Sequence, residues 1–212
     1  RTTFRIASLK GPTTMGLVGL MDDADQGRAR HDYQVEIYGT ADEITPRLLQ
    51  GEIDVALIPC NLASVLYNKT EGAIELAAVN TLGVLYIVTT SQEINSIADL
   101  AGATVYTTGK GTTPEYVLNH VLTQNGLVPG EDVTVEYMSE AAEVLAAMQL
   151  SSGYPVAMLP QPYATTAQAQ VEGLRAALDM TEEWDKVSPD SALVTGVVVV
   201  RRAFAEQNPD AL

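Results

Sequence analysis

The sequence predicts an α/β protein with two lobes, each a mostly parallel β-sheet flanked by helices. Strand-like runs are followed by amphipathic helical runs, which is the βαβα order typical of a parallel sheet. A loop that contains glycine and threonine occurs at 10–14 and again at 110–114, each time after a β-branched run and before a helical one. Residues 76–90 hold two β-rich runs with no helix between them, as expected where the chain crosses from one lobe to the other.

The first lobe is predicted from three strand and helix units. Alternating or unbroken apolar residues indicate the strands, and apolar residues three or four positions apart indicate the helices. The strands are expected at 4–7, 33–38 and 54–58, and the helices that follow them at 15–21, 44–49 and 62–67. Gly27 and Gly51 close the first two helices, and the unbroken third strand is typical of one that is buried on both faces.

The second lobe repeats this pattern after a capping-box spacing at Ser96 and Asp99. Strands are expected at 104–106, 133–137 and 156–159, with helices from Thr113 to the stop at Asn125 and over 141–150. The final run, 193–200, is again strand-like and is expected to return to the first lobe. We therefore place the first lobe at 1–88, the second at 89–191 and the returning segment at 192–212.

Composition excludes several classes of function. The 212 residues carry 27 acidic and 12 basic side chains, and the net charge of -15 argues against a nucleic-acid-binding surface. The apolar runs are too short to span a bilayer. The single cysteine, Cys60, excludes an internal disulfide and an all-cysteine metal site. Because Arg1 is not a natural start, we expect that a leader or anchor has been removed.

No constellation for catalysis is recognisable. The pair Gly109 and Lys110 lacks the glycine spacing and the following Ser or Thr of a nucleotide-phosphate loop. The acidic run 22–25 lacks the twelfth-position glutamate of a calcium loop, so a solvated turn is favoured. His31 and His120 have neither a nearby nucleophile nor a partner at metal-ligand spacing. We therefore predict no catalytic residue, no metal and no cofactor.

The candidate binding residues follow the predicted strands, because ligands of open α/β sheets bind at the carboxyl ends of the strands. Glycine lets the backbone approach a ligand, threonine offers a hydroxyl, and a helix that starts at the loop turns N–H groups toward it. The candidates are Lys10, Gly11, Pro12, Thr13, Thr14, Gly39, Thr40, Cys60, Asn61 and Asn80 in the first lobe, and Thr107, Lys110, Gly111, Thr112, Thr113, Gln161, Pro162 and Tyr163 in the second.

Other roles stay open for several of these residues. Lys10 and Lys110 are the only cations in these loops and suit an anion, although a solvated lysine is the more usual outcome. Cys60 fits a small buried hydrophobic residue better than a ligand contact. Tyr38 and Tyr163 can stack on a planar ligand or fill half-buried core positions.

The chain resembles the substrate-binding proteins of ABC importers in five segments that occur in the same order. They are LKGPT at 9–13, GEIDVA at 51–56, NTLGVLY at 80–86, TGKGTTPEYVL at 108–118 and LPQPY at 159–163. The similarity runs the length of the chain and is to the branch that includes nitrate-, sulfonate-, taurine- and thiamine-precursor-binding proteins.

The resemblance implies a type II periplasmic-binding-protein fold, in which two crossing strands act as a hinge and a small molecule is captured between the lobes by hinge closure. It further implies a monomer that delivers its ligand to a permease in the membrane. The location implied is the periplasm or the extracellular face of the cell membrane, with a lipid anchor on an upstream cysteine.

Two features depart from the pattern of that family. Gln161 stands where members usually have an acidic residue, so a matching donor on the ligand is not expected there. Members also continue past the last strand with helices that pack on the first lobe, so we expect a version extended beyond Leu212 to be more stable.

Two other classes of function are alternatives to a solute-binding protein. The runner-up is an enzyme on the same fold, of thiamine-pyrimidine or menaquinone-pathway type, but the chain lacks the cysteine-rich iron motif of the former. The third class is the effector domain of a transcription regulator, for which no DNA-binding region is visible. The ligand stays open among sulfonates, nitrate, pyrimidines and other heterocycles.

Overall fold

The computed structural model describes residues 1–212 and divides them into two compact units. Unit 1 comprises Arg1–Leu82 and Val194–Leu212, and unit 2 comprises Gly83–Leu193, so the chain passes between the units twice. We expected the first lobe to end at position 88. The structure places the division earlier, between Leu82 and Gly83, because the strand Leu85–Thr89 pairs within the sheet of unit 2. The second division lies after 193 instead of 191.

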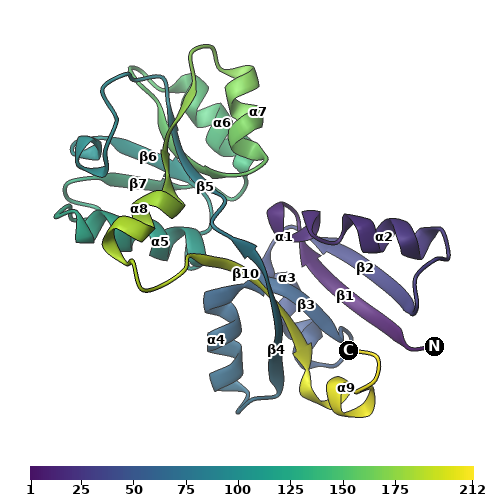
Figure 1. The fold of residues 1–212 in the computed structure, drawn as a ribbon. Coiled ribbons are helices and arrows are strands. Elements are labelled where there is room, and N and C mark those ends of the chain that lie inside the picture. Colours follow the sequence, from purple (N-terminus) through teal and green to yellow (C-terminus); the bar gives the residue numbers. More distant parts are fainter. The chain divides into compact units, whose positions relative to one another are not determined.

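Unit 1 is a five-stranded sheet in the spatial order β2-β1-β3-β10-β4 (Figure 1). Its strands are β1 (Thr3–Leu9), β2 (Asp32–Tyr38), β3 (Val55–Pro59), β4 (Ile74–Leu82) and β10 (Val194–Arg201). β1 pairs in parallel with β2 and β3, whereas β10 returns antiparallel between β3 and β4. The mostly parallel sheet and the return of the last strand are thus confirmed.

The helices of unit 1 pack on both faces of this sheet. They are α1 (Pro12–Met15), α2 (Val18–Asp25), α3 (Ala41–Leu49), α4 (Cys60–Lys69) and α9 (Arg202–Gln207). Ile44 and Leu48, one turn apart on α3, are fully buried against one face, and Phe204 of α9 packs against Phe4 on the other. The helix expected at 15–21 is wrong in its bounds, because the structure has two helices there, broken at Gly16 and Leu17.

Unit 2 has the same plan, with strand order β7-β6-β8-β5-β9. Its strands are β5 (Leu85–Thr89), β6 (Thr104–Thr107), β7 (Thr134–Tyr137), β8 (Val156–Pro160) and β9 (Arg175–Asp179). β6 pairs in parallel with β7 and β8, and β5 lies antiparallel between β8 and β9. Each unit therefore contains one antiparallel strand, and that strand adjoins a crossing of the chain.

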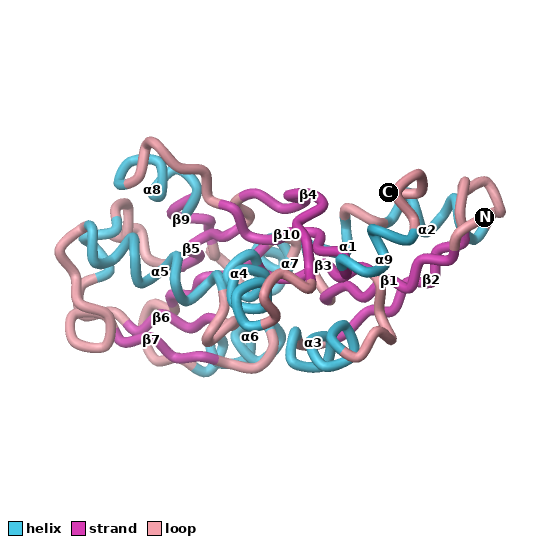
Figure 2. The backbone as a smooth tube through the Cα atoms, turned by 90° about the horizontal axis from the view of Figure 1, so that it is seen from below, coloured by secondary structure: helices cyan, strands magenta, loops and turns pink.

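The helices of unit 2 also cover both faces of its sheet, with a separate core cluster on each face. Figure 2 draws the helices in cyan and the strands in magenta. They are η1 (Ile97–Leu100), α5 (Thr113–Gln124), α6 (Ala141–Leu150), α7 (Tyr163–Gln170) and α8 (Met180–Val187). The segment 175–187, which forms β9 and α8, was not predicted. None of the helices in either unit combines the length and the apolar character that a membrane span requires.

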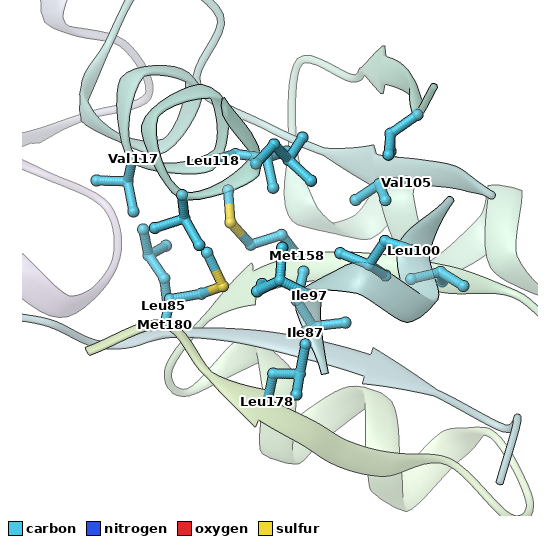
Figure 3. Close-up of a cluster of buried hydrophobic side chains, with 14 of the residues drawn as sticks. Leu85, Ile87, Ile97, Leu100, Val105, Val117, Leu118, Met158, Leu178 and Met180 are labelled. Atoms are coloured by element: carbon cyan, nitrogen blue, oxygen red, sulfur yellow. The ribbon is translucent and has the colours of Figure 1, made fainter. Parts of the chain in front are cut away.

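The larger core of unit 2 explains why α5 forms where it does (Figure 3). Val117, Leu118, Val121 and Leu122 lie on one face of the helix and are buried against strands β5, β6 and β8. Burying a leucine such as Leu118 stabilises the fold by about 1.5 to 3 kcal/mol. This packing fixes the helix start, and with it the loop 108–112 that precedes it.

A buried carboxylate joins β1, β3 and β10 at the end of the sheet where β1 and β3 begin and β10 ends. Asp54 precedes β3, and its side chain is 1% exposed. Its Oδ1 accepts hydrogen bonds from Arg5 Nη2 of β1 at 2.6 Å and from Arg201 Nη2 of β10 at 2.7 Å. The returning strand is thereby held to the sheet by charge as well as by its backbone ladder.

Candidate functional site

Within each unit the candidate residues lie where the parallel strands end. In unit 1, loops follow the carboxyl ends of β1, β2 and β3, and the backbone N–H of Lys10 donates to the carbonyl of Tyr38 at 2.9 Å. That hydrogen bond places the loops after β1 and β2 side by side. In unit 2, the corresponding loops follow β6, β7 and β8.

The threonines of the first loop serve the fold of the loop. The helix begins at Pro12, directly after Gly11, whose φ of 128° is a conformation that favours glycine. Thr13 Oγ1 donates to the carbonyl of Leu9 at 3.2 Å, and the buried Thr14 hydroxyl also donates to that carbonyl. These two hydroxyl protons are used inside the loop, so a ligand that needs donors must find them elsewhere.

The other candidates of unit 1 surround this loop or begin helices. Asn80 of β4 donates from Nδ2 to the carbonyl of Thr13 at 3.1 Å, which brings β4 to the first loop. Thr40 follows Gly39 and caps α3, where Glu43 closes a capping box. Cys60 and Asn61 form the first turn of α4. Burial raises the pKa of the Cys60 thiol, so the thiol stays protonated near neutral pH.

The loop between β6 and α5 is tied to the sheet at one end and to the helix at the other. Thr107 is buried, and its Oγ1 donates to the carbonyl of Met158 in β8 at 2.9 Å. Thr112 caps α5, which begins at Thr113, and its Oγ1 donates to the carbonyl of Gly109 at 2.7 Å. Glu115 accepts a hydrogen bond from the backbone N–H of Gly111. The Gly111 N–H, one of the groups that we expected to face a ligand, is therefore hydrogen-bonded to the carboxylate of Glu115.

Lys110 is exposed on this loop and lies over an aromatic ring. Its Nζ is 5.9 Å from the ring centroid of Tyr137, the last residue of β7. Burial, together with the nearby charge of Glu115, raises the pKa of Tyr137 to about 12. Sequence reasoning missed Tyr137 as a candidate, although it ends a predicted strand and the same rule that selected the other loops would have selected it.

The loop after β8 begins with a side chain that caps a helix. The Oε1 atom of Gln161 accepts hydrogen bonds from the N–H and the hydroxyl of Thr165, at 3.3 and 2.9 Å. The backbone N–H of Gln161 donates to the carbonyl of Val84 at 2.9 Å. Pro162 precedes Tyr163, which starts α7 and lines a groove of about 370 Å³ between α6 and α7.

A second groove, in unit 1, is more apolar. It has a volume of about 380 Å³ and lies between α4 and the strands β4 and β10. Cys60 and Tyr67 line it from the helix, and Leu76 and Val79 line it from β4. Leu76 and Val79 are 62% and 47% exposed, so this part of the edge strand presents an uncovered apolar surface.

The cations of the chain are mostly neutralised, but those of the two loops are not. Most of the arginines pair with acids; among them are Arg28 with Asp22 and Asp23, and Arg47 with Glu36. Arg47 also lies over one face of the Tyr38 ring, with its Cζ 5.5 Å from the ring centroid. Lys10 and Lys110 form no ion pair within the chain.

The histidines take part in packing. Nε2 of His120 lies 2.8 Å from Ser188 Oγ, and its ring is 4.8 Å from that of Trp184. His31 accepts a hydrogen bond on Nδ1 from the N–H of Thr2 and packs edge-on against Phe4. No group of three or more His, Cys, Asp or Glu side chains is arranged to hold a metal ion.

Two five-stranded α/β units joined by two chain crossings, with loops at the ends of the parallel strands, define the type II periplasmic-binding-protein fold. Residues 28–202 match the family model described as ABC transporter, phosphonate, periplasmic substrate-binding protein. The chain belongs to this family, whose members are periplasmic solute-binding components of ABC importers. No curated protein matches the chain by sequence.

Solved structures of binding proteins have the same fold. The chain is similar to the periplasmic aliphatic sulphonate binding protein SsuA from Escherichia coli, at 19% identity and a TM-score of 0.75, over 99% of this chain and 68% of that one. An ABC transporter protein from Parabacteroides distasonis is similar at 23% identity and a TM-score of 0.74, over 100% of this chain and 70% of that one. The periplasmic nitrate-binding protein NrtA from Synechocystis PCC 6803 is similar at 15% identity and a TM-score of 0.68, over 99% and 58%.

Proposed function

We propose that this protein captures a small solute with an oxyanion group, such as a phosphonate or a sulfonate, and delivers it unaltered to a membrane permease. The observation that carries the proposal is the pair of unneutralised lysines, Lys10 and Lys110, at the carboxyl ends of β1 and β6 in a chain of net charge -15. An isolated ammonium group at a strand end suits an anionic ligand. The family description and the names of the structural relatives, which specify phosphonate, sulphonate and nitrate, support the same class.

The hydrogen bonds in the loops favour lysine over threonine as the source of recognition. The hydroxyl protons of Thr13, Thr14 and Thr112 are donated to carbonyl groups of the protein, whereas Lys10 and Lys110 carry the positive charge of the two glycine loops. A receptor of micromolar affinity needs about 8 kcal/mol of binding free energy. Two charge-assisted contacts contribute to that total, since hydrogen bonds to charged groups are about twice as strong as neutral ones.

We extend the proposal to the whole importer component. The protein acts as a monomer, without catalytic activity and without a nucleic-acid partner. A lipid anchor holds it at the outer side of the cytoplasmic membrane. The structural support for the absence of catalysis is that Cys60 is a neutral thiol and that His31 and His120 serve packing.

Calorimetric titration with methylphosphonate, methanesulfonate and nitrate tests the proposal. At least one of these probes is expected to bind with a Kd in the micromolar range, and Lys10→Met and Lys110→Met are each expected to weaken that binding by about tenfold or more. Lys69→Met is the matched control, because Lys69 ends α4 and lies outside the loops. Absence of binding for all three probes, together with a neutral molecule in native mass spectra of the freshly purified protein, would overturn the oxyanion class.

A further inference from the structure

Tyr137 stands beside the loop that carries Lys110. It ends β7, and in the parallel pairing of β6 with β7 it lies opposite Thr107, the last residue of β6. The chain continues from Thr107 into the loop with Lys110, whose ammonium group lies over the Tyr137 ring. Both residues belong to unit 2, so this arrangement does not depend on unit 1.

The ring gives the lysine a preferred position. Lys110 lies between two glycines with left-handed φ values of 80° and 76°, Gly109 and Gly111, and its own side chain is exposed. No carboxylate pairs with it, and the nearby Glu115 is hydrogen-bonded to the Gly111 N–H. The face of Tyr137 is therefore the only group that the structure offers to hold the ammonium ion in place.

The hydroxyl group of Tyr137 is free to act as a donor. It makes no hydrogen bond within the chain, although the ring is half-buried. Burial and the charge of Glu115 keep the phenol protonated well above neutral pH, with a pKa of about 12. A protonated phenol next to an ammonium group is a two-donor arrangement, and such an arrangement suits an anion that has more than one oxygen.

We propose that Tyr137 is a ligand-binding residue of unit 2, whose hydroxyl donates to an oxygen of the bound oxyanion and whose ring positions the Lys110 ammonium for the same anion. This inference rests on the proposed function and adds a ligand contact in unit 2 to it. An anion that meets the two groups through different oxygens carries at least two acceptor oxygens on one centre, as phosphonates, sulfonates and nitrate all do.

Three single variants, and the two double variants that combine each Tyr137 substitution with Lys110→Met, separate the two parts of the proposal. Tyr137→Phe removes the hydroxyl and keeps the ring, Tyr137→Leu removes both, and Lys110→Met removes the cation. The matched control is Tyr154→Phe, because Tyr154 is 69% exposed and lies outside the strand-end loops. Each protein is titrated calorimetrically with the tightest-binding probe among methylphosphonate, methanesulfonate and nitrate, at one fixed salt concentration, and its melting temperature without ligand is recorded.

We expect Tyr137→Phe to weaken binding about 3- to 10-fold and Tyr137→Leu to weaken it a further 2- to 5-fold. When Lys110→Met is also present, Tyr137→Leu and Tyr137→Phe are expected to bind the ligand with the same affinity, because the ring then has no cation to position. If Tyr137 served only the fold, the affinities of Tyr137→Leu and Tyr137→Phe would differ by the same factor with and without Lys110. If Tyr137→Leu fails to fold, Tyr137→Phe alone still decides the role of the hydroxyl.

The outcomes distinguish this inference from the function on which it rests. If the wild-type protein binds none of the probes, the oxyanion function fails and the role of Tyr137 fails with it. If the wild-type protein binds a probe but Tyr137→Phe binds it equally well, the hydroxyl does not contact the ligand and the proposal for Tyr137 is overturned alone. An equal loss in Tyr154→Phe would also overturn it, because the effect would then not be specific to the site.

Discussion

Asp54 illustrates how single side chains hold the first unit together away from the candidate site. Its carboxylate is buried, and both of its guanidinium partners, Arg5 and Arg201, are partly exposed. Burial by itself raises the pKa of Asp54, but the hydrogen bonds from Arg5 and Arg201 outweigh it and hold the pKa below its usual value. Because Arg201 is the last residue of β10, this pairing fastens the far end of the strand that returns from unit 2.

We predict that Asp54→Asn lowers the free energy of unfolding by about 3 kcal/mol, since it leaves two guanidinium groups without their carboxylate. The pH dependence follows from the lowered pKa: the stabilisation is present above the unfolded-state value, near 3.8, and is lost as the pH falls through the folded-state pKa. Urea denaturation at pH 7 and pH 3 measures both effects, and the variant should lose less stability than the wild type between these two conditions.

The control for that experiment is Asp32→Asn. The pair Arg1 and Asp32 is about half exposed on both sides, and such a pair contributes at most about 1 kcal/mol. Equal losses in the two variants would show that burial of Asp54 adds nothing to its pairing.

At the scale of elements, the loop before α5 depends on glycine at one defined position. Gly109 has a φ of 80°, and a Cβ atom there would lie 2.8 Å from both Pro114 Cγ and Thr112 Oγ1. Since Thr112 caps α5 and Pro114 lies in its first turn, the path of the loop and the start of the helix are set together. The same loop carries Lys110, so its geometry determines where the ammonium group is presented.

We predict that Gly109→Ala destabilises the protein by about 2 to 3 kcal/mol, through the cost of a left-handed alanine together with the steric overlap. Gly102→Ala is the matched control, because Gly102 has a φ of 79° but open space around its Cα. It should cost only about 1 kcal/mol. Thermal denaturation measures both values, and the probe that binds the wild type should lose affinity only in the Gly109 variant. Equal destabilisation by the two substitutions would mean that the overlap with Thr112 and Pro114 is relieved without cost.

The periodic parts of the whole molecule could be predicted from the sequence, and the parts that depend on partners far along the chain could not. Runs such as 54–58 and 141–150 have the strand and helix patterns that burial imposes. By contrast, β9 occupies only 175–179 and gains its stability from pairing with β5, which no local pattern reveals. The boundary at Leu82 likewise depends on which sheet β5 joins.

In the candidate site, too, the features that depend on distant partners could not be predicted from the sequence. Because the βαβ order fixes where strands end, the loops could be located from the sequence. The hydrogen-bond partners of the hydroxyls could not be predicted: Thr13 and Thr14 donate to the carbonyl of Leu9, and Thr112 donates to that of Gly109. The cation over Tyr137 depends on β6 and β7 being neighbours, which is a property of the sheet and not of either strand.

Hinge closure is the remaining prediction at the scale of the whole molecule. The chain crosses between its units only at Leu82 to Gly83 and at Leu193 to Val194, so two short segments govern any change in their arrangement. A ligand shifts such an equilibrium by its preference for one arrangement over the other. We therefore expect a saturating oxyanion to lower the radius of gyration measured by small-angle X-ray scattering. The Lys10→Met and Lys110→Met double variant, at the same ligand concentration, should keep the radius of the free protein. A radius that does not change for the wild type, under conditions where calorimetry shows full occupancy, would mean that this receptor holds its solute without closing.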